Sequence, residues 1–427
     1  MLKKIFNNKE VISWSLYDFA NQPFTTLIVT FIFSAFFTES LAENNQVGTS
    51  LWSLGISITA IFVAITSPFL GAIADSGGYR KVFLMVSTYL CVLATIILYF
   101  FEPNQTYNFF SLELDVAIVA LIVFIFANIG FEFGTVFCNS YLSELSNKKN
   151  MGKISGYAWG LGFVGGLISL AVSFIFLDLN EITHIRAINL FVAFWFLIFS
   201  IPTFLFLKDT KPDRAVHSYF KQSFNSIITS LKNVKEHKKI VRFLIARVFY
   251  NDALITIFAF GGIYAAGSLK FSFNEILILG VVLNISACFG SFLFGNIEDK
   301  IGVKKMLILT LWTLLISSVL AFLAPFLTNF DNLITPKTLF WIAGVFIGLM
   351  QGPNQAGSRS LMARLTPEDK KNEFFGFYAF SGKATAFIGP LFFGLLTSAF
   401  GTQQAGLVII IIFFIIGILI FKPLLNE

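Results

Sequence analysis

Residues 71–81 read GAIADSGGYRK, and residues 295–305 read GNIEDKIGVKK. Both stretches follow the pattern G-x-x-x-D-x-x-G-x-[RK]-K, and each stands where one long apolar segment ends and another begins. Glycine permits the backbone conformations that a tight turn needs. The two stretches therefore predict two short helix–helix turns, each carrying one carboxylate and a pair of cations, in a chain built from two related halves.

The composition is that of a membrane protein. Of the 427 residues, 56% are hydrophobic and 13% are charged, whereas soluble globular domains carry about 25% charged residues. Apolar segments of about 20 residues recur, each long enough to cross a ~30 Å hydrocarbon core as a helix. They are continuously apolar and too long for barrel strands. We expect an all-α polytopic protein with twelve transmembrane helices at residues 12–38, 51–74, 82–101, 116–142, 155–177, 186–207, 241–268, 274–297, 306–328, 338–360, 374–398 and 404–422.

The basic residues divide unequally between the two sides of this predicted topology. The side that holds both termini carries 26 of the 30 lysines and arginines. Because cytoplasmic loops are enriched in Lys and Arg, both termini are predicted to be cytoplasmic. The net charge of +6 then reflects topology and contact with the anionic lipid of the bilayer, and no nucleic-acid partner is expected.

A second internal alignment supports a duplicated chain. The two turns match at an offset of 224 residues, and an offset of 220 places Gly156 on Gly376. Weak similarity of this kind is typical of transporters built from repeats. We expect two pseudo-symmetric six-helix bundles, at residues 1–207 and 241–427. The polar segment 208–240 is predicted to be a cytoplasmic linker with a basic amphipathic helix on the membrane surface.

Four ionisable residues lie inside the predicted helices, where such groups are costly and normally face a cavity or a partner. They are Asp18, Glu132, Asp252 and Lys383, at similar predicted depths. Either they serve substrate, proton or gate directly, or Lys383 neutralises one carboxylate as a permanent ion pair. Glu132, between two phenylalanines, is the candidate for proton coupling, and the coupling ion, proton or Na⁺, stays open.

The predicted substrate-binding residues combine these charges with neutral hydrogen-bonding groups: Asp18, Asn21, Asp252, Gln351, Asn354 and Lys383. A zwitterionic solute needs a cation for its negative group and an acceptor for its positive group, and this set supplies both. Proline removes a backbone hydrogen bond from a helix. We therefore expect a bend at Pro23, a break at Pro353 and an interruption at Gly389-Pro390.

The two turns are predicted to form gates whose contacts differ between conformational states. Each carboxylate can reach a helix N-terminus or a cation of the facing bundle. The repeat aligns Arg364 with Glu144, so the charge is inverted between the halves at this position; anchoring of the arginines to lipid headgroups is the alternative. The predicted gating residues are Gly71, Asp75, Gly78, Arg80, Lys81, Gly295, Asp299, Gly302, Lys304, Lys305, Glu144, Arg359 and Arg364.

No motif of a catalytic, nucleotide-binding or metal site was found in the sequence. It contains no HExxH, GxSxG or GxxxxGK[ST] pattern, so we expect neither an enzyme nor a cofactor. Cys91, Cys138 and Cys288 fall inside predicted helices without CxxC spacing and are interpreted as core residues.

Several longer stretches resemble one family. Residues 14–25 read WSLYDFANQPFT, residues 352–365 read GPNQAGSRSLMARL, and residues 373–390 read EFFGFYAFSGKATAFIGP. With the two turns, they are similar to the Unknown Major Facilitator family of the major facilitator superfamily, which includes the fungal autophagy-related vacuolar amino-acid effluxer. The resemblance spans nearly the whole chain. Ser76 departs from it, because a basic residue is usual after the Asp of the turn.

The resemblance implies a secondary transporter that moves an amino acid, or a related zwitterion or organic anion, by rocker-switch alternating access, with efflux as the family's precedent. The lean non-cytoplasmic loops indicate a bacterial protein of the cytoplasmic membrane. We also expect a monomer. One alternative is a non-transporting sensor or scaffold on a transporter fold. Another is a carrier of an unrelated small metabolite or drug.

Overall fold

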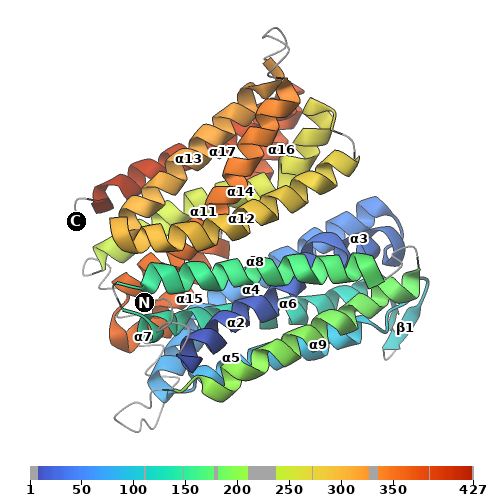
Figure 1. The fold of residues 1–427 in the computed structure, drawn as a ribbon. Helices are drawn as coiled ribbons and strands as arrows, with labels where there is room; N and C mark the ends of the chain where they lie inside the picture. Colours follow the sequence, from blue (N-terminus) through green and yellow to red (C-terminus); the bar gives the residue numbers. More distant parts are fainter. Residues whose placement is uncertain are drawn as a thin grey trace. The chain divides into compact units, whose positions relative to one another are not determined.

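The computed structural model describes residues 8–109, 112–147, 149–176, 181–209, 237–271, 273–326, 335–383 and 385–425. Within these ranges the chain is a series of long helices, with one short hairpin of strands (Figure 1). The elements are α2 (Lys9–Pro23), η1 (Phe24–Phe31), α3 (Phe33–Phe36), η2 (Phe37–Leu41), α4 (Asn45–Gly77), α5 (Arg80–Leu98), β1 (Thr106–Phe109), β2 (Leu112–Asp115), α6 (Val116–Ser140), α7 (Leu142–Leu145), α8 (Met151–Phe176), α9 (Ile182–Phe206), α11 (Lys238–Leu269), α12 (Phe273–Ile301), α13 (Val303–Leu323), η3 (Ala324–Phe326), α14 (Pro336–Leu365), η4 (Glu368–Lys370), α15 (Lys371–Lys383), α16 (Ile388–Phe400), α17 (Gln403–Phe421) and η5 (Lys422–Leu425).

Among the described residues, eleven helical segments are long and apolar enough to cross a membrane. The predicted span that is not among these eleven is the tenth, at residues 338–360, and it corresponds to α14, which has 30 residues. It is less apolar because Gln351, Asn354 and Gln355 interrupt it, and most of its second half is buried in protein. A helix enclosed by other helices can carry such polar side chains, whereas one that faces lipid cannot.

The two repeated turns have the predicted geometry. Gly78 and Gly302 adopt positive φ angles of 63° and 90°, a conformation that costs glycine little and other residues more. Gly78 separates α4 from α5, and Gly302 separates α12 from α13. Short helix–helix connections at both places are therefore confirmed.

The prolines act differently from one helix to another. At Pro23 the first span changes from α-helix to the π-helical segment η1, as expected for a residue without an N–H. The expected break at Pro353 is wrong, because α14 runs through it. The predicted interruption at Gly389-Pro390 lies a few residues earlier, between Lys383 and Ile388. Pro390 instead stands in the first turn of α16, where a missing N–H costs nothing.

The described chain forms two compact units. The first comprises Met1–Tyr141, Leu161–Ile227 and Asp369–Gly376, and the second comprises Leu142–Gly160, Ile228–Glu368 and Phe377–Glu427. In the first, α2 packs on α9, and α5 and α4 pack on α6; in the second, α14 packs on α12 and α13, and α17 on α11 (Figure 1). Most of the predicted linker, residues 210–236, lies outside the described residues.

The helices α8 and α15 each contribute residues to both units, and the internal repeat explains why. Within the second unit, a Cβ on Gly156 of α8 would lie 2.6 Å from the Ser291 carbonyl oxygen of α12. Within the first unit, the Ser67 hydroxyl of α4 donates to the Gly376 carbonyl oxygen of α15 at 3.1 Å. Ser67 aligns with Ser291, and Gly156 with Gly376, so the same close helix contact occurs twice.

Strands β1 and β2 form an antiparallel hairpin between the third and fourth spans, with Tyr107 opposite Leu114. No strand was predicted from the sequence between the spans 82–101 and 116–142. Arg186 of α9 secures this region, because it pairs with Glu102 at 2.5 Å and donates to the Tyr99 carbonyl oxygen at 2.8 Å. The hairpin adds to the helical fold without altering the helix order.

Candidate functional site

The eleventh span is broken inside the second unit. Helix α15 ends at Lys383 and α16 begins at Ile388. The intervening turn is short, with the Ile388 N–H donating to the Thr385 carbonyl oxygen at 2.8 Å. A broken helix presents carbonyl groups at one end and N–H groups at the other, and these need partners in a membrane protein.

Two consecutive residues of α11 supply partners on both sides of the break. Asn251 Nδ2 donates to the Gly382 carbonyl oxygen at 3.3 Å, and Asp252 Oδ2 accepts from the Gly389 N–H at 2.9 Å. Asp252 is 2% exposed. Its second oxygen, Oδ1, has no hydrogen-bond partner among the described residues.

Arg247, one turn before Asn251 on α11, holds the last turns of α15. Its guanidinium donates to the Tyr378 carbonyl oxygen at 2.8 Å and to the Ser381 hydroxyl at 3.0 Å. It also stacks on the Tyr378 ring, 3.7 Å from the centroid. Arg247 was not among the site residues predicted from the sequence. Its four-residue spacing from Asn251 was the available signal that both lie on one helix face.

The polar residues of α14 divide between two directions. Gln355 Nε2 donates to Asn251 Oδ1 at 3.2 Å, which joins α14 to the break. Asn354 is fully buried and donates to the Thr310 hydroxyl of α13 at 3.0 Å. Gln351 is half-buried, one turn before Gln355. Asn354 was predicted to line the substrate site, but its observed hydrogen bond is with α13. Gln355 was not among the predicted substrate-binding residues, although it bonds to Asn251 beside the break.

The remaining predicted site residues belong partly to the first compact unit and partly to the second. Asp18 and Glu132 are half-buried, and Asn21 is 6% exposed, all in the first unit. Lys383, half-buried at the end of α15, belongs to the second unit with Asp252. Convergence of the two sets on one site stays a prediction.

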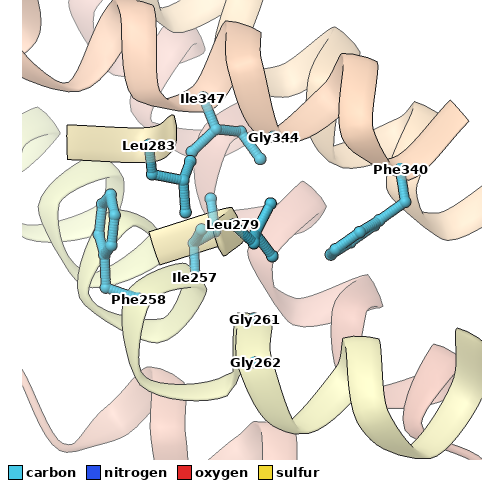
Figure 2. Close-up of a pocket in the computed structure, with 9 residues that line it drawn as sticks. All are labelled: Ile257, Phe258, Gly261, Gly262, Leu279, Leu283, Phe340, Gly344 and Ile347. Atoms are coloured by element: carbon cyan, nitrogen blue, oxygen red, sulfur yellow. The ribbon is translucent and has the colours of Figure 1, made fainter. Parts of the chain in front are cut away.

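A small apolar cavity lies between α11, α12 and α14 of the second unit (Figure 2). It has a volume of about 70 Å³. On α14, Phe340, Gly344 and Ile347 line it. The four-residue step from Ile347 leads to Gln351 on the same helix face. From α11 and α12 the lining residues are Ile257, Phe258, Gly261, Gly262, Leu279 and Leu283. The cavity offers an apolar surface one turn away from polar side chains.

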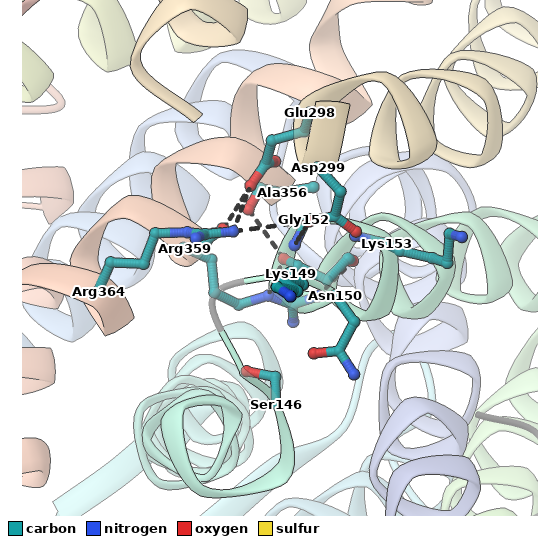
Figure 3. A network of polar contacts seen from close by, with 12 residues as sticks. Ser146, Lys149, Asn150, Gly152, Lys153, Glu298, Asp299, Ala356, Arg359 and Arg364 are labelled. Carbon is teal, nitrogen blue, oxygen red and sulfur yellow. Dashed lines mark hydrogen bonds and ion pairs between the residues drawn. The ribbon is translucent and has the colours of Figure 1, made fainter. Parts of the chain in front are cut away.

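The carboxylate of the second glycine turn, residues 295–305, caps a helix. Asp299 accepts hydrogen bonds from the backbone N–H groups of Gly152 and Lys153, at 2.9 Å and 3.0 Å, in the first turn of α8 (Figure 3). Arg364 stands 3.6 Å from Asp299. Gly295 favours this close approach, because a Cβ there would make a tight contact, 3.0 Å from the Gly152 carbonyl oxygen.

A buried network extends from this cap along α14 (Figure 3). Arg359 is 2% exposed and donates to the Ser155 hydroxyl at 3.0 Å and to the Ser155 carbonyl oxygen at 2.8 Å. Glu298, also 2% exposed, accepts from the Ser360 hydroxyl at 2.5 Å and lies 3.7 Å from Arg364. Glu298 was missed, although its position next to the Asp of the motif marked it.

At the first glycine turn, residues 71–81, the acceptor is a carboxylate from outside the repeated motif. Asp209, after α9, accepts from the Lys81 N–H at 3.0 Å and from the Tyr141 hydroxyl at 2.7 Å. Arg80 is buried and lies over the Tyr141 ring, 4.1 Å from the centroid. The side chain of Asp75 lies outside the part of the chain that the structure describes.

The other predicted gating residues are placed as follows. Lys304 donates to the Leu424 carbonyl oxygen at 2.6 Å, near the end of the chain. Lys305 and Glu144 are exposed. The proposed correspondence between Glu144 and Arg364 therefore stays a prediction. The three cysteines form no disulfide: Cys91 and Cys138 are buried, and Cys288 is half-buried.

Comparison with known proteins identifies related sequences and folds. A family model described as vacuole effluxer Atg22 like matches residues 43–426. The uncharacterized MFS-type transporter YxiO of Bacillus subtilis (strain 168) is 27% identical, over 98% of this chain and 95% of its own length. Autophagy-related protein 22 of Kluyveromyces lactis is 25% identical over 64% of this chain, but the match spans 58% of that protein.

Among solved structures, the proton:xylose symporter XylE of the major facilitator superfamily, bound to 6-bromo-6-deoxy-D-glucose, superposes with a TM-score of 0.72. The superposition covers 97% of this chain and 95% of that one, at 13% identity. An identity this low is evidence for the fold alone. The chain has the major facilitator fold and is an integral, multi-pass membrane protein.

Proposed function

The chain belongs to the family of vacuole effluxer Atg22-like proteins within the major facilitator superfamily, and from this premise we propose that it exports an amino acid or a related zwitterion. Transport would proceed by alternating access around a site inside the membrane. The Bacillus relative, described as an MFS-type transporter, supports the general class of secondary transporter.

The observation that carries the proposal is the break between α15 and α16. Non-helical backbone at membrane depth is tolerated where it is buried in protein or lines a cavity. Here the break is bordered by Lys383, and Asn251 and Gln355 bring hydrogen-bonding groups beside it. Broken helices of this kind form substrate and ion sites in secondary transporters.

The proposed substrate contacts follow from the charges of a zwitterion. Lys383 would bind the carboxylate, and Asp18 would accept from the ammonium group, with Asn21, Gln351 and Gln355 as neutral partners. Of the residues first predicted, we leave Asp252 and Asn354 out of this set, because their side chains bond to α16 and α13. The apolar cavity beside Gln351 offers space for a nonpolar part of the solute.

The proposed gate is the contact between Asp299 and the first turn of α8. Charge-assisted caps of this kind are lost when the facing helices separate, so they stabilise one conformational state over another. In this proposal both termini and both glycine turns are cytoplasmic, in keeping with the distribution of Lys and Arg. We propose a monomer in a bacterial cytoplasmic membrane.

Counterflow in proteoliposomes tests the proposed substrate class. Vesicles loaded with unlabelled amino acids should accumulate labelled ones, whereas loading with sugars should have no effect. Lys383→Ala should weaken the apparent affinity by about tenfold or more, equivalent to about 1.4 kcal/mol. Lys383→Arg keeps the positive charge and should retain part of the affinity.

The matched control is Lys238→Ala, because Lys238 is exposed at the start of α11 and belongs to neither the proposed substrate site nor the predicted gate. If folded Lys383→Ala protein keeps the wild-type affinity, Lys383 is no substrate ligand. If wild-type protein exchanges sugars and no amino acids, the substrate class is wrong.

A further inference from the structure

Asp252 is a buried carboxylate whose two oxygens have different surroundings. Oδ2 accepts from the Gly389 N–H at the start of α16, at 2.9 Å. Oδ1 is also buried and has no hydrogen-bond partner among the described residues. The backbone of α11 lies close to α16 here, since a Cβ on Gly389 would lie 3.2 Å from the Asp252 carbonyl oxygen.

A carboxylate oxygen without a donor is costly in an apolar interior when the group is charged. A proton on that oxygen removes the charge of the carboxyl group and makes the oxygen a donor. Unlike a metal cation, a proton needs no further protein ligands. The other oxygen remains an acceptor for the Gly389 N–H, so the cap can persist in the neutral form. The geometry therefore suits one proton per carboxyl group.

We propose that Asp252 binds and releases the proton that accompanies solute transport. The proposal rests on the proposed transport function, and it replaces Glu132, which the sequence analysis favoured for this role. Glu132 is half-buried on α6 of the first unit. Asp252 is more deeply buried and is directly bonded to the broken helix.

Among the described residues, no charged side chain forms a hydrogen bond or an ion pair with this carboxyl group. Helices α16 and α17 contain no titratable side chain along their described lengths. Within two turns of Asp252 on α11, the titratable residues are Arg247 and Tyr250. The titratable and charged residues elsewhere on the neighbouring elements are Lys238, Lys239, Arg242 and Tyr264 on α11, Lys371, Glu373, Tyr378 and Lys383 on α15, Lys337, Arg359 and Arg364 on α14, and Glu275, Cys288, Glu298, Asp299 and Lys300 on α12. Arg247 is already committed to the Tyr378 carbonyl oxygen and the Ser381 hydroxyl.

The cap couples proton binding at Asp252 to the proposed substrate site. A charged carboxylate binds an N–H group at a helix N-terminus more strongly than a neutral carboxyl group does. Protonation of Asp252 therefore weakens the hold of α11 on α16. The loosened helix start adjoins the turn that begins at Lys383, so proton binding and solute binding affect the same short segment.

The test measures proton movement alongside solute flux in proteoliposomes loaded with a pH-sensitive dye. Addition of an amino-acid mixture to wild-type vesicles should change the lumenal pH. Asp252→Asn keeps an oxygen for the Gly389 N–H but cannot titrate. It should abolish the pH change, and its counterflow rate should vary less than about twofold between mildly acidic and mildly alkaline buffer.

Asp115→Asn is the matched control. Asp115 also caps a helix, accepting from the Ala117 N–H at 2.7 Å, but it is exposed at the start of α6. That variant should keep the wild-type pH change and pH profile. A loss caused by removal of a cap in general would appear in both variants.

Several outcomes would overturn the inference. Proton movement that survives in Asp252→Asn excludes this residue as the proton site, as does a loss that occurs in Glu132→Gln alone. Transport driven by a Na⁺ gradient, without a pH change in wild-type vesicles, also contradicts it while leaving the transport function intact. Absence of any amino-acid counterflow in wild-type protein would instead mean that the proposed function has failed.

Discussion

Asp299 shows why the repeated motif requires a short acidic side chain. Its two oxygens accept from two consecutive backbone N–H groups in the first turn of α8. The first N–H groups of a helix have no partner within the helix. A carboxylate there satisfies these donors and interacts with the helix dipole, and such caps are worth about 0.5–2 kcal/mol.

Asp299→Asn should therefore weaken this contact by about 1 kcal/mol without preventing folding, because the amide keeps one acceptor oxygen but loses the charge. The contact should open about five- to tenfold more often. The alkylation rate of a cysteine placed at Ala356, which is 2% exposed next to Ser155, measures this opening in a background without the three native cysteines. Asp115→Asn, a cap on a different helix, should leave the rate unchanged; an equal rate in Asp299→Asn would exclude a gating role for this carboxylate.

Arg364 is expected to act through the same carboxylate. Its guanidinium lies 3.6 Å from Asp299 and 3.7 Å from Glu298, and it is mostly buried. A double-mutant cycle of Asp299→Asn and Arg364→Gln, read by the same alkylation rate, should give a coupling energy of about 0.5–1 kcal/mol. Coupling below about 0.3 kcal/mol would favour the alternative in which Arg364 anchors the protein to lipid headgroups.

At the scale of elements, the break between α15 and α16 depends on α11. Arg247 and Asn251 bond to α15, and Asp252 bonds to α16. Pro390 adds to the break, because its ring fits the first turn of a helix and disfavours continuation from the preceding residues. The broken span is thus specified by two helices together.

Asn251→Ala should destabilise the second unit by about 1–3 kcal/mol, since it removes the donor to the Gly382 carbonyl oxygen and leaves the Gln355 amide without its acceptor. Thermal unfolding in detergent should show a transition temperature lowered by a few degrees. Asn284→Ala is the matched control, because Asn284 donates within its own helix to the Gly280 carbonyl oxygen. Equal transition temperatures for the two variants would show that Asn251 contributes no more than an ordinary helix residue.

At the scale of the whole molecule, the internal repeat is visible as a repeated helix contact. A Cβ on Gly156 would lie 2.6 Å from the Ser291 carbonyl oxygen, and a Cβ on Gly376 would lie 2.6 Å from the Pro68 nitrogen. Both distances are shorter than side chains tolerate, so glycine is required at both places. Small residues allow such close helix packing in membranes.

Gly156→Ala and Gly376→Ala should therefore have similar effects, each destabilising the protein by about 1–3 kcal/mol through overpacking. Gly280→Ala should be neutral or stabilising, because no atom of another described element lies within 4 Å of a Cβ there and alanine has the higher helix propensity. Transition temperatures of the three variants check this expectation. Unequal effects at Gly156 and Gly376 would show that the two halves do not share this contact.

The sequence by itself determined the class of the molecule. Long apolar segments, the repeated glycine turns and the motifs at residues 14–25 and 352–390 predicted a helical membrane transporter of the major facilitator superfamily, and the fold and family comparisons confirm this. These features are readable because they are local: hydrophobic length sets the spans, and glycine sets the turns at Gly78 and Gly302.

The tertiary structure alone decided which polar groups meet. The sequence singled out Asp252, Asn354 and Lys383 by depth, but it could not show that Asn354 bonds to α13, that Gln355 bonds to Asn251, or that Arg247 holds α15. Depth along a helix is fixed by a constant rise per residue, whereas direction depends on helix rotation and on neighbours far away in the chain. Partners such as Asp299 and Gly152 are far apart in the sequence, and helix packing brings them within hydrogen-bond distance. No local sequence pattern specifies which distant residues pack together.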